Sequence, residues 1–197
     1  MNLNISIKNF RCFDEKGAEF QLRPLTFLTG GNSSGKSSFV KAFMVLGNYW
    51  EDLKRASKQE NRIDPYKIPL NFARGGLKLG QFNSVINKND DSSEKSIVFS
   101  YDAFSFLCRD VLHVTLQFNI REKDKMNLGW LTAFSIKDSN NAVLYKSEKG
   151  RIEYNLTPLV DEFYKYLDVC KYSKEGEAEL TVYGDKMKEK MSHVPYQ

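Results

Sequence analysis

Residues 27–43, FLTGGNSSGKSSFVKAF, decide the fold that we expect for this chain. An apolar run comes first, glycines, serines and an asparagine follow, and a second apolar stretch closes the segment. Within it, Gly30, Gly35, Lys36 and Ser37 satisfy the pattern G-x-x-x-x-G-K-[ST]. This pattern forms a phosphate-binding loop when a strand precedes it and a helix follows it. The flanking sequence therefore tests the match.

The residues before and after the loop have the hydrophobic patterns of the strand and the helix that a phosphate-binding loop requires. Leu25 to Thr29 is a nearly continuous apolar run, typical of a strand that is buried on both faces. After the loop, apolar residues recur at helical spacing and form one stripe of a five-turn helix: Phe39, Phe43, Leu46, Trp50 and Leu53, with Val40 and Met44 beside them. We therefore expect a strand, a glycine-rich turn and a helix, in that order.

Each residue type in the loop suits the binding of a triphosphate. Backbone N–H groups must converge on the β-phosphate, which requires small residues and some positive φ angles; the residues that meet this need are Gly30, Gly31, Asn32, Ser33, Ser34 and Gly35. A helix that starts near Lys36 adds unpaired N–H donors and the positive end of its dipole. Lys36 is expected to reach the β- and γ-phosphates, Ser37 to ligate Mg²⁺ and Ser38 to donate to the α-phosphate.

The rest of the chain predicts mainly strands. Leu3 to Ile7 alternates apolar and polar residues, and Ala18 to Leu22 is a second short strand before the loop. Further strands, of which the first four form an antiparallel meander, are predicted at these positions: Ser96–Tyr101, His113–Ile120, Leu128–Ile136, Val143–Lys146 and Glu179–Tyr183. In the second of these strands, His113–Ile120, the apolar face ends at Ile120. In the third, Leu128–Ile136, the apolar face includes Trp130. Thr157 caps a predicted helix before the last strand.

A basic segment separates the predicted helix from the meander. From Lys54 to Lys88 there are eight basic residues against two acidic ones, together with prolines and glycines. This composition favours a long solvated loop, and a patch that faces nucleic-acid phosphates is the alternative. We therefore interpret residues 1–197 as one incomplete domain with four parts. These are 1–58 with strands, loop and helix, 59–95 as a basic excursion, 96–184 as a β-rich subdomain with one helix, and 185–197 as a tail.

The composition is that of a globular protein, with 41% apolar and 27% charged residues and a net charge of +4. No apolar run approaches the roughly 20 residues of a membrane span, and the start lacks the apolar block of a signal peptide. We expect a cytoplasmic protein with no membrane contact.

The three cysteines, Cys12, Cys108 and Cys170, are too widely spaced for a zinc site or a disulfide framework. Of the two histidines, His113 falls on the polar face of its strand and His193 in the tail.

Two segments, ISIKNFRCF (5–13) and LTFLTGGNSSGKSSFVKAF (25–43), resemble the ABC-type ATPase heads of the RecF, SMC and OLD families. A third, LKLGQFNSVINKND (77–90), is similar to the G-x-F-x-x-x-[IV] segment of AAA-type ATPases related to OLD nucleases and to bacterial anti-phage systems. The resemblance implies an α/β P-loop NTPase of ABC-ATPase-head type, with ATP and Mg²⁺ as cofactors. This chain would supply its N-terminal lobe, with a largely antiparallel β-meander. Arg11, beside Phe10 and Phe13, would lie at the edge of the nucleotide site; for both phenylalanines, core packing is the alternative.

The same resemblance implies catalytic parts that this chain matches poorly. Gln81 is the candidate for the glutamine of a Q-loop near Mg²⁺. Asp161 and Glu162 in LTPLVDEF resemble a Walker B pair, which stands at the end of a buried strand. Pro158 would interrupt such a strand, and the spacing of the apolar residues is helical. We therefore interpret these acids as first-turn residues of a helix. The segment SKEGE (173–177) has no glycine at the place that a signature motif needs.

The sequence therefore predicts an ATP-binding portion of such an ATPase, acting in DNA repair or anti-phage defence. We expect no catalytic residue in this chain, so that hydrolysis depends on the remaining C-terminal ATPase lobe. The other partners that the resemblance implies are a second head, which would dimerise around ATP, DNA, and a nuclease partner or domain. The alternative is a P-loop phosphotransferase that acts on a small molecule. The two strands before the loop and the all-β stretch after its helix favour the ATPase.

Overall fold

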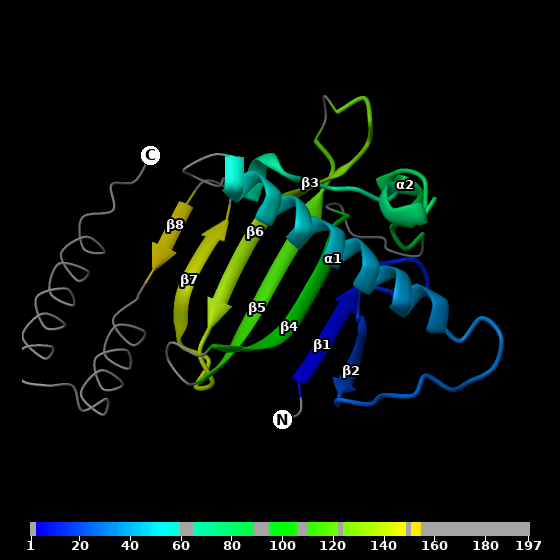
Figure 1. Ribbon diagram of the computed structural model, residues 1–197, viewed down its shortest axis with the longest axis horizontal. Helices are drawn as coiled ribbons and strands as arrows, with labels where there is room; N and C mark the ends of the chain where they lie inside the picture. The colour runs from blue at the N-terminus through cyan, green and yellow to red at the C-terminus, as the bar shows by residue number, and fades with distance from the viewer. Residues whose placement is uncertain are drawn as a thin grey trace, which may run out of the picture.

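The computed structural model describes residues 3–59, 65–88, 95–105, 110–121, 124–148 and 151–154. They form one antiparallel sheet with a long helix across one of its faces (Figure 1). The sheet has the strand order β2-β1-β4-β5-β6-β7-β8, and β3 pairs with β6. The elements are β1 (Leu3–Lys8), β2 (Ala18–Leu22), α1 (Lys36–Gln59), the 3-10 helix η1 (Pro65–Lys67), β3 (Pro69–Leu70), the 3-10 helix η2 (Arg74–Gly76), α2 (Phe82–Val85), β4 (Ile97–Ser105), β5 (Asp110–Asn119), β6 (Gly129–Lys137), β7 (Val143–Glu148) and β8 (Arg151–Tyr154).

The predicted meander is present, because alternating apolar residues give each central strand one buried face. β5 buries Leu116 and Phe118 almost completely, and Leu116 lies opposite Phe99 of β4. The strands from β4 to β8 follow one another along the sheet as antiparallel neighbours. β8, which the sequence did not indicate, adds the edge beyond β7. This arrangement fits an α/β ATPase-like fold.

Helix α1 covers the sheet with a face that includes Phe39, Leu46 and Leu53 of the predicted stripe but not Phe43 and Trp50. The apolar residues that it buries are Phe39, Ala42, Val45, Leu46, Tyr49 and Leu53. The Tyr49 ring meets Phe118 of β5 edge to face at 5.0 Å between centroids. Phe43 and Trp50, predicted to face inward, are each 38% exposed, and Val40 and Met44 more so. The apolar surface of α1 is wider than one stripe, and the sheet covers only part of it.

The predicted strand from Leu25 to Thr29 is wrong for this structure. These residues adopt no regular structure, and Leu25 and Phe27 are 71% and 78% exposed. A strand buried on both faces needs hydrogen-bonded neighbours and cover on two sides. In the part of the chain that the structure describes, no strand pairs with this segment, so its apolar side chains stay in solvent.

Two details of the predicted strand faces are also corrected. Ile120, expected inside, is 40% exposed because β5 ends at Asn119. In β6, Leu131 is buried while Trp130 is only half-buried. The register between β5 and β6 shifts at Gln117/Phe118, and this irregularity changes which residues of β6 face the core.

The basic excursion is not the solvated loop that its composition favours. β3 joins the sheet, and the side chains of Leu70, Phe72, Phe82 and Val85 are almost fully buried. Arg74 forms an ion pair with Asp52 of α1. The apolar residues between the charges thus tie this segment to the core. The predicted helix at Thr157, the strand from Glu179 to Tyr183 and the tail lie outside the described residues, where the structure does not test them.

No helix among the described residues is long and apolar enough to cross a membrane.

Candidate phosphate-binding site

The glycine-rich loop lies at the N-terminus of α1, where the motif predicts it. Positive φ angles occur at Gly30 (142°), Ser33 (67°) and Gly35 (93°), the conformations for which small residues are suited. Gly35 is also tightly surrounded: a Cβ there would lie 3.1 Å from Cys12 Sγ and 3.2 Å from Phe13 Cε1. Only a residue without a side chain fits this turn without displacing its neighbours.

Lys36 folds back over the loop. Its ammonium donates to the carbonyl oxygens of Gly30 and Gly31, both at 2.6 Å, and to Ser34 Oγ at 3.2 Å. An ammonium has three donors, so these bonds use all of them. A phosphate that binds Lys36 must exchange at least one of these bonds for its own oxygen.

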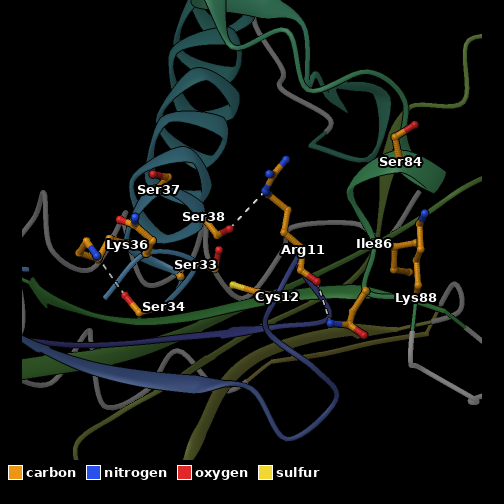
Figure 2. A pocket seen from close by; sticks show the side chains of 13 residues that line it. Arg11, Cys12, Ser33, Ser34, Lys36, Ser37, Ser38, Ser84, Ile86 and Lys88 are labelled. Carbon is orange, nitrogen blue, oxygen red and sulfur yellow. Dashed lines mark hydrogen bonds between the residues drawn. The ribbon is translucent and has the colours of Figure 1, made fainter. Parts of the chain in front are cut away.

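A pocket of about 810 Å³ opens beside the loop (Figure 2). Its lining residues come from three segments: Arg11 and Cys12; Asn32, Ser33, Ser34, Gly35, Lys36, Ser37 and Ser38; and Ser84, Ile86, Asn87 and Lys88. Among these described residues there are three basic side chains, Arg11, Lys36 and Lys88, and no acidic one. With several hydroxyl groups and a helix N-terminus, such a lining attracts an anion.

Arg11 is held in a defined position at the pocket wall. Its backbone has a positive φ of 55°, which is uncommon for a residue with a side chain. The backbone N–H of Arg11 donates to Val85 O at 2.7 Å, and Asn87 Nδ2 donates to Arg11 O at 2.7 Å. The guanidinium Nε donates to Ser38 Oγ at 3.2 Å. Arg11 and Ser38, which the sequence analysis named separately, are therefore in contact.

The wall formed by Ser84 to Lys88 was missed by the sequence analysis, as was Cys12. Asn87 is 5% exposed, and its backbone N–H donates to Asn9 O at 3.1 Å, across from Arg11. A signal was present, because the stretch from Leu77 to Asp90 resembles a segment of related ATPases. That resemblance did not show which side chains line the site, because the hydrogen bonds from Asn87 to Arg11 and Asn9 join residues that are far apart in the sequence.

Other predicted residues lie elsewhere. Gln81 precedes α2 and is not part of the pocket lining, so its role near Mg²⁺ stays a prediction. Phe10 is fully buried and its ring lies 6.1 Å from that of Phe99, which supports the core-packing alternative. Phe13 packs beneath Gly35. The acids of LTPLVDEF, together with His193, Cys108 and Cys170, lie outside the described residues.

His113 lies on β5, and a carboxylate partner accompanies it. Its Nδ1 is 2.6 Å from Asp102 Oδ1 on β4. Asp102 also accepts bonds from the backbone N–H and the side-chain amide of Asn4, at 2.9 and 2.8 Å. Burial raises the pKa of Asp102, but these hydrogen bonds and His113 outweigh that effect and lower it below its ordinary value. Neither residue lines the pocket, and no group of three potential metal-ligating side chains lies together in the described ranges.

The comparisons with known proteins give one finding. A family model described as an AAA domain matches residues 4–191. This range includes the glycine-rich loop, α1 and all three segments of the pocket wall. No curated protein and no solved structure matches the chain.

Proposed function

The chain belongs to the AAA domain family, whose members are nucleotide-binding ATPases, and on that premise we propose that it is the ATP-binding portion of a RecF/SMC/OLD-like ATPase. The observation that carries this proposal is the pocket beside the loop. It combines a P-loop, a helix N-terminus and three basic side chains without an acidic residue in the described lining. A polyphosphate is the ligand whose charge and oxygen atoms match this lining.

The pocket residues also suit Mg²⁺ as a companion of the nucleotide. Mg²⁺ takes oxygen ligands and keeps several waters, and in nucleotide sites the phosphates supply part of its coordination. The Ser37 hydroxyl lies in the lining and is the oxygen ligand that the motif provides. When bound, the ion would neutralise charge on the β- and γ-phosphates. Lys36 and the loop N–H groups would orient the same phosphates.

Hydrolysis requires groups that the described lining does not contain. A carboxylate must orient the attacking water, and an acidic residue must help to hold Mg²⁺. We propose that a C-terminal ATPase lobe supplies both. The exposed apolar side chains of Leu25 and Phe27 before the loop, and of Val40 and Met44 in the first turns of α1, support this, because such a lobe could cover them.

The biological role that we propose is DNA repair or anti-phage defence. ATP would drive the dimerisation of two heads, and DNA and a nuclease would be the other partners. The segments 5–13, 25–43 and 77–90 support this role through their resemblance to the RecF, SMC and OLD families. The antiparallel sheet argues against the alternative of a small-molecule phosphotransferase, since such kinases are built from alternating strands and helices.

Calorimetric titration of Mg-ATP into the wild-type chain and into Lys36→Ala tests nucleotide binding. Loss of the charge-assisted bonds of Lys36 should cost about 1.5–3 kcal/mol, which is roughly ten- to a hundredfold in affinity. Lys146→Ala on β7 is the matched control, because this exposed lysine pairs only with Glu148 among the described partners and lies far along the sheet. Equal affinities of Lys36→Ala and wild type would remove the P-loop interpretation.

A measurement of phosphate release tests whether ATP hydrolysis depends on a C-terminal lobe. The 197-residue chain should release phosphate near the uncatalysed background, and Glu162→Gln should leave that rate unchanged. Addition of the C-terminal lobe should restore turnover. Robust hydrolysis that Glu162→Gln abolishes would show instead that LTPLVDEF is a Walker B strand.

A further inference from the structure

We propose that Asn87 is a positioning residue of the pocket, which acts through Arg11 by holding its guanidinium in place for a phosphate of the nucleotide. This inference rests on the proposed function, because it assumes that the pocket binds ATP. It assigns a role to a buried side chain that neither the phosphate-loop motif nor the family match identifies. It is supported by the backbone of Arg11, by two hydrogen bonds from Asn87 and by the donors of the guanidinium.

The backbone of Arg11 has a conformation that depends on its neighbours. Its φ of 55° lies in the left-handed region, where few residues with a side chain occur unless surrounding contacts hold them. The Arg11 N–H donates to Val85 O at 2.7 Å, and Arg11 O accepts a bond from Asn87 Nδ2 at 2.7 Å. Both polar groups of the Arg11 backbone are therefore bonded to the wall at residues 84–88. These bonds fix the direction in which the Arg11 side chain leaves the backbone.

Asn87 contacts the turn that carries Arg11 at two points. Besides the bond from Nδ2 to Arg11 O, its backbone N–H donates to Asn9 O at 3.1 Å. Asn87 is 5% exposed, so water competes little for its amide. The wall is also packed by apolar residues, since Phe10 and Val85 are both fully buried in the core. Removal of the Asn87 amide should therefore loosen Arg11 while the wall stays in place.

The guanidinium of Arg11 has donors left for a ligand. Its Nε donates to Ser38 Oγ at 3.2 Å, and Figure 2 shows the side chain reaching toward the start of α1. This bond orients the plane of the guanidinium. Of the five N–H donors of an arginine, the four on Nη1 and Nη2 have no acceptor among the residues that the structure describes. A planar set of donors beside Ser38, the residue expected to donate to the α-phosphate, matches two oxygens of a phosphate.

A double-mutant cycle on ligand binding separates a positioning role from a merely structural one. Mg-ATP is titrated by calorimetry into wild type, Asn87→Ala, Arg11→Met and the double variant. Arg11→Met should weaken binding about tenfold, because a charge-assisted contact is lost, and Asn87→Ala about three- to tenfold. In the Arg11→Met background, Asn87→Ala should weaken binding by less than about twofold, since the side chain that it positions is gone.

Asn48→Ala is the matched control. Asn48 Nδ2 donates to Arg74 O at 3.3 Å, which is the same kind of bond as that from Asn87 to Arg11, and neither residue lines the pocket. Its loss should leave the affinity for Mg-ATP unchanged. Thermal unfolding checks that each variant is folded. Should Asn87→Ala fail to fold, Asn87→Ser takes its place in the cycle, because serine keeps a polar group on the wall but is too short to reach Arg11 O.

The outcomes separate this inference from the proposed function. If Asn87→Ala weakens binding by the same factor in both backgrounds, it acts on the wall as a whole, and the positioning role is wrong. The role is also wrong if Asn87→Ala has no effect while Arg11→Met weakens binding. If Arg11→Met has no effect while Lys36→Ala weakens binding, the phosphate loop stands and this inference fails. If the wild type does not bind Mg-ATP, the proposed function fails and this inference fails with it.

Discussion

Two stretches that both carry leucine and phenylalanine have opposite fates in this molecule. In β5, Leu116 and Phe118 are 1% and 0% exposed, whereas Leu25 and Phe27 before the loop are 71% and 78% exposed. β5 lies between β4 and β6 with α1 over one face, while in the described chain no strand pairs with residues 25–29. An apolar run therefore predicts burial only when the rest of the fold supplies the surface that covers it.

The largest effect should come from exchanging one aromatic ring in each stretch for alanine. Phe118 packs against Tyr49 and Phe99, so Phe118→Ala should lower the free energy of unfolding by about 3–5 kcal/mol. Phe27→Ala should change it by no more than about 0.5 kcal/mol. Urea unfolding of both variants measures the difference. A cost for Phe27→Ala comparable to that for Phe118→Ala would break the contrast between the stretches.

Within the exposed loop, one glycine should behave like a core residue. Gly35 has a φ of 93° and close neighbours on the side where a Cβ would lie, whereas Gly31 has nothing within 4 Å and no positive φ. Gly35→Ala should lower stability by about 1–2 kcal/mol, and Gly31→Ala by no more than about 0.5 kcal/mol. Thermal unfolding of both variants provides the test. Equal effects would mean that the loop conformation does not depend on the contact of Gly35 with Cys12 and Phe13.

The smallest effect concerns the polar contacts between β1, β4 and β5. Because the folded state lowers the pKa of Asp102 from 3.8, it binds its proton less readily than the unfolded chain does. Its contribution to stability is therefore present above that value and is lost as the pH falls through the folded pKa. Asp102→Asn should cost about 1 kcal/mol at pH ~7 and less at pH ~3. Denaturant unfolding at both pH values checks this; a cost independent of pH would contradict it.

The sequence predicts most strands correctly because alternation is a local property. In Val114, Leu116 and Phe118 the apolar side chains share one face of β5 whatever lies beside it, and the same holds for Ile5 and Ile7 in β1. The phosphate loop is equally local, since its glycines and Lys36 lie within a few positions of one another. These features needed no knowledge of the remaining chain.

The features that sequence analysis missed depend on contacts between distant segments. Spacing alone places the buried residues Phe39, Leu46 and Leu53 of α1 correctly. That Ala42, Val45 and Tyr49 are buried with them, and Phe43 and Trp50 are not, follows from the position of the sheet beneath the helix. The wall around Lys88 joins the site through backbone bonds to Asn9 and Arg11, and no local pattern encodes that pairing. The pairing of β3 with β6 is likewise non-local.

The hydrogen bond from Asn87 Nδ2 to Arg11 O spans 76 positions of the chain, and this separation has a consequence for protein synthesis. A ribosome that adds roughly 5–20 residues per second completes the phosphate loop several seconds before it reaches Lys88. During that interval the nascent chain carries the whole loop motif but only one side of the pocket. A nucleotide that contacts both sides of the pocket can therefore stabilise the fold only after residues 84–88 have been synthesised and have docked.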